Sequence, residues 1–405
     1  MHPAAPNPRI GRALSLALVM SLLAAGAAPA QDFRAASPNA PDQRPAFAGQ
    51  TRAPLIQDKT ELRTTVIAKG LVHPWGMAEL PDGRWLVTER PGRLRLVGAD
   101  GKMSEPIHGV PPVAAGGQGG LLDVAVRGDF AQSRRIWWSY SEPRENGANA
   151  TAVATGVLSP DGAQLSEVRV VFQQQPAWRS SMHFGSRLVF DRQGALFVTT
   201  GDRSDATARR LAQDVTTTIG KVVRINPDGG AASGNPSLQR GLPEIWSYGH
   251  RNIQAAALGP DGALWLVEHG ARGGDELNRP AAGRNYGWPI ITYGIDYSGR
   301  PIGEGLTARE GLEQPLYYWD PVIAPSGMVF YDGALFPEWR GSILIGGLAS
   351  RSLVRLTLAG QRVSGEARYF QGQWRVRDVE VARDGAVMIL TDHSDGALIR
   401  LTPAR

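Results

Sequence analysis

The 405-residue chain contains no cysteine. Disulfide bonds and thiolate chemistry are therefore excluded, and the burial of apolar surface must supply the stability. Lysine is also scarce, because among 43 basic residues only Lys59, Lys69, Lys102 and Lys221 are lysines. The remaining basic residues are arginines, so any single arginine is weak evidence for a binding site.

Long hydrophobic runs are almost absent. The longest, Ala13–Ala28, follows Arg9 and Arg12 and is shorter than the roughly 20 residues that span a bilayer. Its small-residue end predicts a cleavable signal peptide over residues 1–30, a periplasmic or secreted protein, and no transmembrane anchor. Residues 31–57 are rich in Ala, Pro, Gln and Asn and predict a flexible tether, which leaves residues 58–405 as the folded domain.

The charge is close to balanced. The formal charge is +5, and without Arg9 and Arg12 it falls to +3. No run of basic residues occurs, which argues against nucleic-acid binding and against a polybasic membrane patch. The histidines lack the HxH and HExxH spacings of zinc sites, and no GxGxxG motif for nicotinamide or flavin follows a strand.

Four segments of the chain repeat one pattern: a turn, a buried strand and then a carboxylate. They are Asp82–Glu89, Arg192–Asp202, Asp261–His269 and Asp384–Asp392. The turn glycine permits positive φ angles, and the β-branched and aromatic run after it is too short for a helix. The repeat predicts strands throughout the domain.

The spacing of these turns predicts the architecture. Gly83, Gly194, Gly262 and Gly385 are 111, 68 and 123 residues apart, which fits two, one and two units of about 60 residues. Five steps imply six units, and no stretch resembles a long amphipathic helix. We therefore predict an all-β fold, a six-bladed β-propeller. We expect the repeated segments to be its innermost strands, so that the residues just after them converge, in loops, on the central channel and carry the function.

Seven unusual motifs occur at predicted loop positions. They are Gly116–Gly120, His183–Arg187, His250–Asn252, Glu268–Asn278, Asn285–Trp288, Trp319–Gly327 and Arg375–Arg377. Together and in this order, the motifs resemble those of the soluble quinoprotein aldose and glucose dehydrogenases. The resemblance covers about residues 60–403. It implies a six-bladed propeller that binds pyrroloquinoline quinone (PQQ) and calcium and oxidises aldose sugars at the anomeric carbon to lactones.

By this resemblance, His183 is the general base that takes the proton of the sugar hydroxyl. A histidine suits this role because its pKa lies near neutral pH. Asp202, at the end of a repeat strand, is expected to orient His183 and to stabilise its protonated form.

A cofactor with three carboxylates and an ortho-quinone needs positive charge and planar donors in its pocket. The resemblance assigns this role to Gln118, Arg251, Asn252, Asp275, Trp319, Arg351, Arg375 and Arg377, with Tyr317 as an alternative to Trp319 against the cofactor ring. Ala349 stands where the soluble glucose dehydrogenases carry a lysine. Arg351, two residues on, is a candidate replacement.

Oxygen ligands suit calcium. The resemblance assigns the cofactor's calcium to the carbonyls of Gly270 and Ala271, although proline is usual at the second position. It assigns a second, structural calcium to Glu276, the carbonyl of Tyr286 and Asp296.

Two other functions remain open from the sequence. Six-bladed propellers also serve as calcium-dependent lactonases, which need acidic ligands from several blades around one calcium, and some propellers are binding modules without catalysis. The arginine and amide side chains of the motifs favour the dehydrogenase. The expected partners are an aldose and a soluble electron acceptor; the identity of the sugar and a monomeric or homodimeric state are left open.

Overall fold

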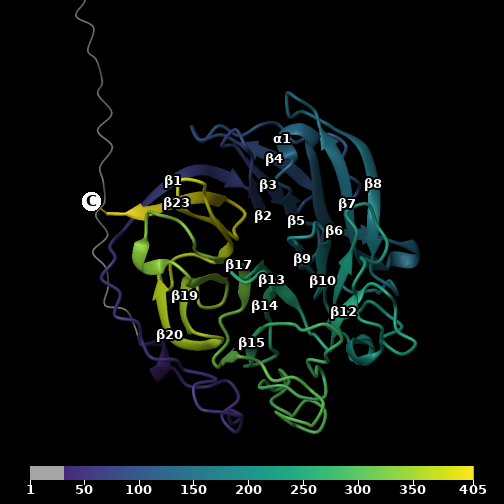
Figure 1. The fold of residues 1–405 in the computed structure, drawn as a ribbon, viewed down its shortest axis with the longest axis vertical. Helices are drawn as coiled ribbons and strands as arrows, with labels where there is room; N and C mark the ends of the chain where they lie inside the picture. The colour runs from purple at the N-terminus through teal and green to yellow at the C-terminus, as the bar shows by residue number, and fades with distance from the viewer. Residues whose placement is uncertain (1–31, 405) are drawn as a thin grey trace, which may run out of the picture. The chain divides into compact units, whose positions relative to one another are not determined.

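The computed structural model describes residues 32–404, so the predicted signal peptide lies outside the described residues. The described chain forms six antiparallel sheets, five of four strands and one of three, arranged around a common centre (Figure 1). Each sheet is one blade. The predicted six-bladed β-propeller is thus confirmed.

The first three blades follow one another along the chain. Blade 1 contains β2 (Pro74–Glu79), β3 (Trp85–Glu89) and β4 (Arg93–Val97). Blade 2 contains β5 (Leu121–Val126), β6 (Arg135–Pro143), β7 (Asn149–Leu158) and β8 (Leu165–Gln173). Blade 3 contains β9 (Gly185–Phe190), β10 (Leu196–Thr200), β11 (Lys221–Ile225) and β12 (Ile245–Tyr248).

The last three blades complete the ring. Blade 4 contains β13 (Ile253–Leu258), β14 (Leu264–Glu268), β15 (Asp275–Asn278) and β16 (Tyr317–Trp319). Blade 5 contains β17 (Pro325–Phe330), β18 (Ile343–Gly347), β19 (Ser352–Ala359) and β20 (Arg362–Tyr369). Blade 6 contains β21 (Val376–Val381), β22 (Val387–Thr391), β23 (Gly396–Pro403) and β1 (Leu62–Leu71).

Helical structure is sparse in residues 32–404. It consists of α1 (Phe130–Ser133) and the 3₁₀ turns η1 (Phe33–Ala35), η2 (Glu145–Gly147), η3 (Ala208–Gln213) and η4 (Pro337–Trp339). Over the same residues, no helix reaches the length and apolar character that a bilayer crossing requires.

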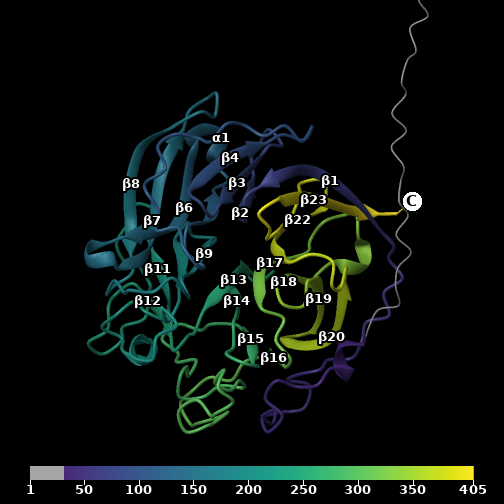
Figure 2. The same cartoon turned by 180° about the vertical axis from the view of Figure 1, so that it is seen from behind.

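The ring is closed by the two ends of the domain. Strand β1 pairs antiparallel with β23 from Leu62 opposite Pro403 to Leu71 opposite Gly396. Figures 1 and 2 show the indigo β1 beside the yellow β23. Because β1 precedes blade 1 and completes blade 6, the pairing joins the first blade to the last and removes a free sheet edge.

The repeated segments prove to be the second strands of their blades, not the innermost ones. They form β3, β10, β14 and β22, and the turn glycines before them have φ angles between 80° and 88°. Second strands end at the face where the inner strands begin. The convergence predicted for the repeat ends therefore occurs at this face, which we call the inner-strand entry face.

All six inner strands have a register shift near their first residues. Hydroxyl groups of second strands bond to the peptide groups that these bulges free. Thr88 accepts from the N–H of Gly76 in its own blade (2.9 Å) and donates to the carbonyl of Leu122 in the next blade.

The same bridge recurs around the ring. Ser139 accepts from the N–H of Asp123 (2.9 Å) and donates to the carbonyl of Ser186 (2.7 Å). Thr199 accepts from the N–H of Arg187 (2.9 Å) and donates to the carbonyl of Ile253 (3.0 Å). Blades 1 to 4 are thus joined in sequence by buried hydroxyl groups.

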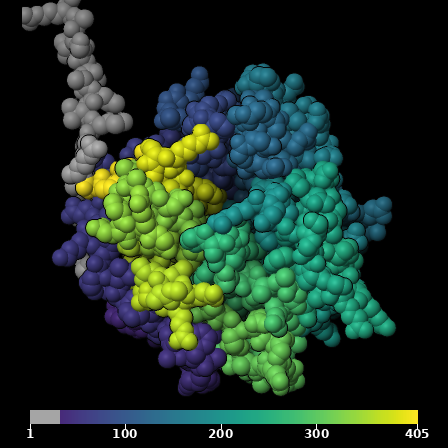
Figure 3. Space-filling view, in the orientation of Figure 1, coloured from purple at the N-terminus to yellow at the C-terminus, as the bar shows by residue number. Residues whose placement is uncertain are grey.

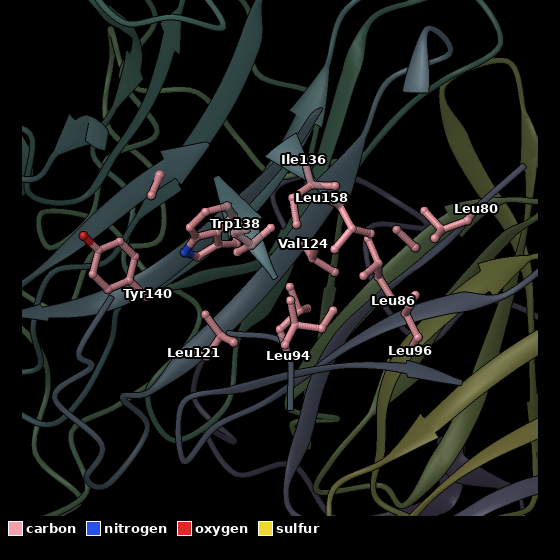
Figure 4. Close-up of a cluster of buried hydrophobic side chains, with 14 of the residues drawn as sticks. Leu80, Leu86, Leu94, Leu96, Leu121, Val124, Ile136, Trp138, Tyr140 and Leu158 are labelled. Atoms are coloured by element: carbon pink, nitrogen blue, oxygen red, sulfur yellow. The ribbon is translucent and has the colours of Figure 1, made fainter. Parts of the chain in front are cut away.

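The apolar core is divided among the interfaces between blades. In one cluster, side chains of blade 1 such as Leu86 and Leu94 pack against Val124, Ile136 and Trp138 of blade 2 (Figure 4). The other large clusters join the remaining neighbouring pairs of blades in the same way. Each blade is therefore stabilised by both of its neighbours.

The segment before β1 departs from the sequence prediction. Residues 32–57 do not form a free tether but pack on blades 4 and 5, as the purple segment of Figure 3 shows. The side chain of Asp320 accepts from the backbone N–H of Ala40 (2.9 Å), and Gln50 donates to the carbonyl of Pro315 (2.9 Å). Composition missed this because the segment has no strand or helix periodicity, and its attachment combines hydrogen bonds with buried side chains such as Ala53, which joins the core between blades 4 and 5.

The bridging hydroxyls predict a test of the fold. Replacing Thr88 by valine leaves the N–H of Gly76 and the carbonyl of Leu122 buried without this partner. We expect the free energy of unfolding, measured by chemical denaturation, to fall by about 2 kcal/mol or more. Thr65→Val, at an exposed position of β1, is the control and should change it by less than about 0.5 kcal/mol. Equal effects of the two variants would contradict the bridging role.

Candidate active site

Several of the predicted site residues gather at the inner-strand entry face. His183 lies two residues before β9, Arg251 and Asn252 precede β13, and Arg377 lies near the start of β21. Asp202 follows the end of β10. Strands β9 and β13 lie next to the centre of the ring in Figure 1. Residues almost 200 positions apart are thereby brought to one place.

His183 and Asp202 form a close polar pair at this face. The Nδ1 atom of His183 lies 2.6 Å from Oδ1 of Asp202, and both side chains are buried. The other carboxylate oxygen accepts from the indole N–H of Trp288 (2.8 Å), and Oδ1 also accepts from the N–H of Ser204 (2.8 Å). Asp202 is thus fixed from three sides, and Nε2 is the nitrogen of His183 left for a ligand.

The electrostatic surroundings keep His183 neutral. Burial lowers its pKa, and the charge of Arg251 lowers it further, while the hydrogen bond to Asp202 acts in the opposite direction. Burial also acts to raise the pKa of Asp202, but the hydrogen bond from His183, the charge of Arg251 and the hydrogen bond from the N–H of Ser204 leave that pKa below its ordinary value. The pair is therefore a neutral imidazole held by a carboxylate.

Gln118 belongs to the same site, but it binds backbone groups of the segment before β9. Its Oε1 atom accepts from the N–H of His183 (2.8 Å), and its own N–H donates to the carbonyl of Ser181 (2.8 Å). These contacts fix the segment that carries the histidine.

Arg251 and Asn252 present donors without partners. The guanidinium of Arg251 donates to the carbonyls of His269 (3.1 Å) and Gly270 and lies 5.2 Å from the ring centre of Trp288. Its Nε atom and the Nδ2 atom of Asn252 are buried without a hydrogen-bond partner. Because unpaired buried donors are costly, they mark a place where a ligand with acceptor oxygens would be stabilised.

A second group of cations surrounds Asp392. Its Oδ2 atom accepts from Arg377 (2.9 Å) and Arg375 (3.3 Å), while Oδ1 lies 3.0 Å from Nδ1 of His73 and 3.7 Å from Arg90. Although burial acts to raise the pKa of Asp392, these cations, Arg377 foremost, hold it far below the usual range. Three arginines face one carboxylate here, so positive charge is in excess. Nε of Arg377 is also buried without a partner.

The sequence missed several members of this site. Asp392 ends the fourth repeat and was recognised only as part of the repeat pattern. Trp288 lies in a recognised motif, but nothing in that motif indicates that its indole reaches Asp202 of the neighbouring blade. Arg90 and His73 carry no signal that distinguishes them from other basic residues.

Trp319 does not lie in the site, and its prediction as a cofactor contact is wrong. It is 2% exposed, packs in the core between blades 4 and 5, and donates its indole N–H to Glu366 (3.1 Å). Tyr317, the alternative, donates to the same carboxylate (2.9 Å). Both rings are fixed by β16, whose side chains at these positions face the next blade.

Arg351 lies at the rim rather than in the pocket. It follows β18 in an exposed turn and donates to the carbonyl of Gln373 (2.9 Å). Its guanidinium therefore does not take the place of a lysine above the buried cations. Arg375, half exposed, lies between this rim and Asp392.

Asp275 has its carboxylate occupied by the backbone. One oxygen accepts from the N–H of Gly270 (2.8 Å), and the other accepts from those of Ile323 (2.8 Å) and Ala324 (2.7 Å). These bonds tie the turn at Gly270 to the loop before β17. Asp275 thus shapes the pocket wall, and the backbone takes three of the roughly four acceptor sites of its carboxylate.

The expected metal ligands are brought together only in part. Gly270, Glu276 and Tyr286 line one cavity together with Glu268, and Ala271 follows Gly270 in its turn. Asp296 does not line it, because its carboxylate accepts from Ser298 within an exposed turn. Over residues 32–404, no group of three or more His, Cys, Asp or Glu side chains has the arrangement of a metal site.

Glu268 takes the place beside Glu276 that was expected for Asp296. The two glutamates are register partners on β14 and β15, and the amide of Asn278 donates to both (3.2 Å each). Burial raises the pKa of Glu276 well above its usual value, and the charge of Glu268 raises it further. A carboxylate pair of buried Glu268 and half-buried Glu276, with backbone oxygens nearby, suits a hard cation.

Comparison with known proteins agrees with this geometry. The profile of the family "Glucose / Sorbosone dehydrogenase" matches residues 71–400. The aldose sugar dehydrogenase YliI of Escherichia coli is 45% identical over 345 residues, which are 84% of this chain and 92% of that protein.

Solved structures give the same result. The apo-form of the soluble aldose sugar dehydrogenase of Escherichia coli superposes with a TM-score of 0.81 at 43% identity, over 85% of this chain and 100% of the other. The PQQ-bound aldose sugar dehydrogenase of Streptomyces coelicolor superposes with a TM-score of 0.68 at 28% identity, over 84% and 99% of the two chains. As the sequence motifs predicted, the chain belongs to the glucose/sorbosone dehydrogenase family.

Proposed function

We propose that this protein is a PQQ- and calcium-dependent dehydrogenase that oxidises aldose sugars at the anomeric carbon to lactones. The observation that carries the proposal is the combination, at one face, of a neutral His183 held by Asp202 with buried arginine and amide donors that lack partners. An anionic, planar cofactor rich in acceptor oxygens fits this donor set. The PQQ-bound relative from Streptomyces coelicolor supports the assignment.

The residues that would hold the cofactor fall into two groups. Arg377 and Arg375, with their excess charge over Asp392, would bind cofactor carboxylates, and Arg251 with Asn252 would bind oxygens on the opposite side. The carbonyls of Gly270 and Ala271 would bind its calcium. When bound, the quinone supplies the acceptor for the two electrons and hydrogen of the anomeric C–H bond, and calcium polarises it as a Lewis acid.

The chain's own contribution to the reaction is proton transfer. Nδ1 of His183 faces Asp202, so Nε2 would receive the proton of the anomeric hydroxyl. The adjacent carboxylate would stabilise the imidazolium that forms, and its own position is fixed by Trp288. The buried pair keeps the base in one orientation before the sugar binds.

We further propose a structural cation at Glu276 and the carbonyl of Tyr286, with Glu268 rather than Asp296 as the neighbouring carboxylate. The excess negative charge of the two glutamates supports this site. We also propose that the protein is exported, on the strength of residues 1–30 as a signal peptide, and that it passes electrons to a soluble acceptor.

A calcium-dependent lactonase is the alternative that geometry disfavours. Such a site needs several carboxylates around one metal at the channel mouth, whereas the cluster of Arg90, Arg375 and Arg377 occupies the mouth around a single carboxylate. A binding module without catalysis would not need the buried pair of His183 and Asp202.

Reconstitution tests the proposed function directly. Apoprotein supplied with PQQ and calcium should reduce an artificial dye when an aldose is added, and calcium chelation before reconstitution should prevent it. Nicotinamide in place of PQQ should give no oxidation. Lactone hydrolysis by the apoprotein with calcium alone, without dye reduction, would instead favour the lactonase.

The arginines differ in their expected effect on cofactor affinity. Arg377→Gln should weaken PQQ binding by roughly 10- to 100-fold, because a charge-assisted contact contributes about 1.5–3 kcal/mol. Turnover at saturating PQQ should change little, since the contact is made equally in ground and transition states. Arg351→Gln is the control, and its PQQ affinity should stay within about threefold. Titration of PQQ into both variants measures these affinities. An equal loss of PQQ affinity in the two variants would place Arg351 in the pocket.

His183→Ala should lower kcat by roughly 10²- to 10⁴-fold while PQQ affinity and Tm stay near normal. His108→Ala, at an exposed position, is the control. Because the pKa of His183 is lowered, its basic form persists in mild acid, and the acid limb of kcat/KM should lie below about pH 6.5. Rapid reduction of quinone-loaded His183→Ala by an aldose would remove His183 from the mechanism.

A further inference from the structure

The backbone at His183 has an unusual conformation that needs support. Its φ angle is +49°, in the left-handed region that residues other than glycine rarely adopt. The residue lies between the loop after β8 and the first residue of β9. Without restraint on both sides, this segment would favour other conformations, and the imidazole would lose its alignment with Asp202.

Arg203 restrains the segment before His183. Its Nε atom donates to the carbonyl of Met182 (3.1 Å), and its Nη2 atom donates to that of Ser180 (2.6 Å). The same Nη2 donates to the side chain of Asn149 at the start of β7 (2.6 Å). The planar guanidinium therefore ties two peptide groups of the loop to blade 2 in a fixed geometry.

Arg203 also restrains the residue after His183. The guanidinium carbon lies 3.9 Å from the ring centre of Phe184, close enough for a cation–π contact. Phe184 is itself buried against Trp75 and Leu122. One side chain thus contacts the chain on both sides of the histidine.

The position of Arg203 in the sequence couples this restraint to the histidine's partner. Arg203 directly follows Asp202, which bonds to the imidazole. Burial lowers the pKa of Arg203 only to about 10, so it remains charged at neutral pH. Its side chain has no exposed surface, so it does not touch a ligand and acts through its neighbours.

We propose that Arg203 is a positioning residue for the general base: Asp202 orients the imidazole, and Arg203 fixes the backbone on both sides of it. The inference rests on the function proposed above for His183. It assigns a role to a buried charge that the folding of blade 3 alone does not require, since its contacts go to the loop that carries His183 and to Asn149 of blade 2.

The test compares Arg203→Lys with Arg224→Lys. Lysine keeps the charge at position 203 but cannot bond both carbonyls and stack on Phe184. Arg224 is a matched control in the same blade, because it is 8% exposed, donates to the carbonyl of Ser233 (2.8 Å) and lies near the rings of Phe197 and Trp246. Both variants remove a buried guanidinium that holds a loop, but only the loop held by Arg203 carries His183.

Arg203→Lys should lower kcat of the PQQ-loaded enzyme by roughly 10- to 100-fold, since small misplacements of a catalytic group have effects of this size. PQQ affinity and the KM for aldose should stay within about threefold. Arg224→Lys should show a similar loss of Tm with normal kcat. If Arg203→Lys does not fold, Phe184→Leu removes only the ring contact and should still lower kcat.

A second measurement separates this inference from the proposed function. In ¹⁵N-histidine-labelled apoprotein, the Nδ1 proton of His183 bonded to Asp202 should give a downfield signal that is absent from His183→Ala. Arg203→Lys should broaden or shift that signal, and Arg224→Lys should not. An unchanged signal together with normal kcat would overturn the role of Arg203. A perturbed signal in a protein without dehydrogenase activity would uphold the positioning and refute the function.

Discussion

The bulge at the start of each inner strand is the constraint on which the rest of the molecule depends. A bulge frees peptide groups from the ladder, and buried peptide groups must find other partners. In blades 1 to 3 these partners are hydroxyls that also bond to the following blade, such as Thr88 and Thr199. The bulges lie beside the site residues, because His183, Asn252 and Arg377 are at or just before the bulged starts of β9, β13 and β21. Blade association and site assembly therefore share one structural feature.

The strand arrangement also brings acidic residues next to histidine and arginine side chains at the entry face. Three second strands, β10, β14 and β22, end at or just before an acidic residue that contacts a histidine or arginine near the start of an inner strand: Asp202 with His183, Glu268 with His250, and Asp392 with Arg377. Buried donors of Arg251, Asn252 and Arg377 remain unpaired at the same face, and their energetic cost favours a ligand with acceptor oxygens there.

The residues that sequence patterns misplaced share a physical reason. Trp319 lies in a motif next to site residues in the sequence, but the pairing of β16 with β15 determines the direction of its side chain. The direction of the Arg351 side chain is likewise determined by the turn after β18. Asp296, predicted as a metal ligand, instead accepts a hydrogen bond from Ser298 within its own turn. Glu268, which was not predicted, lies beside Glu276 because the two are partners in the pairing of β14 with β15. Composition likewise gave no account of residues 32–57, since their attachment is made by specific hydrogen bonds to Asp320 and Pro315.

By itself, the sequence determined the strand-rich class, the number of blades and the pairing of His183 with Asp202, because turn glycines and strand periodicity are local properties and the motifs carry a family resemblance. The tertiary structure alone decided which strand of each blade carries the repeat and which carboxylate neutralises Arg377. It also decided that Trp288 contacts Asp202, that Trp319 packs in the core, and that Arg203 holds the loop before His183. The contacts of Trp288 and Arg203 join residues of neighbouring blades, which no local sequence pattern encodes.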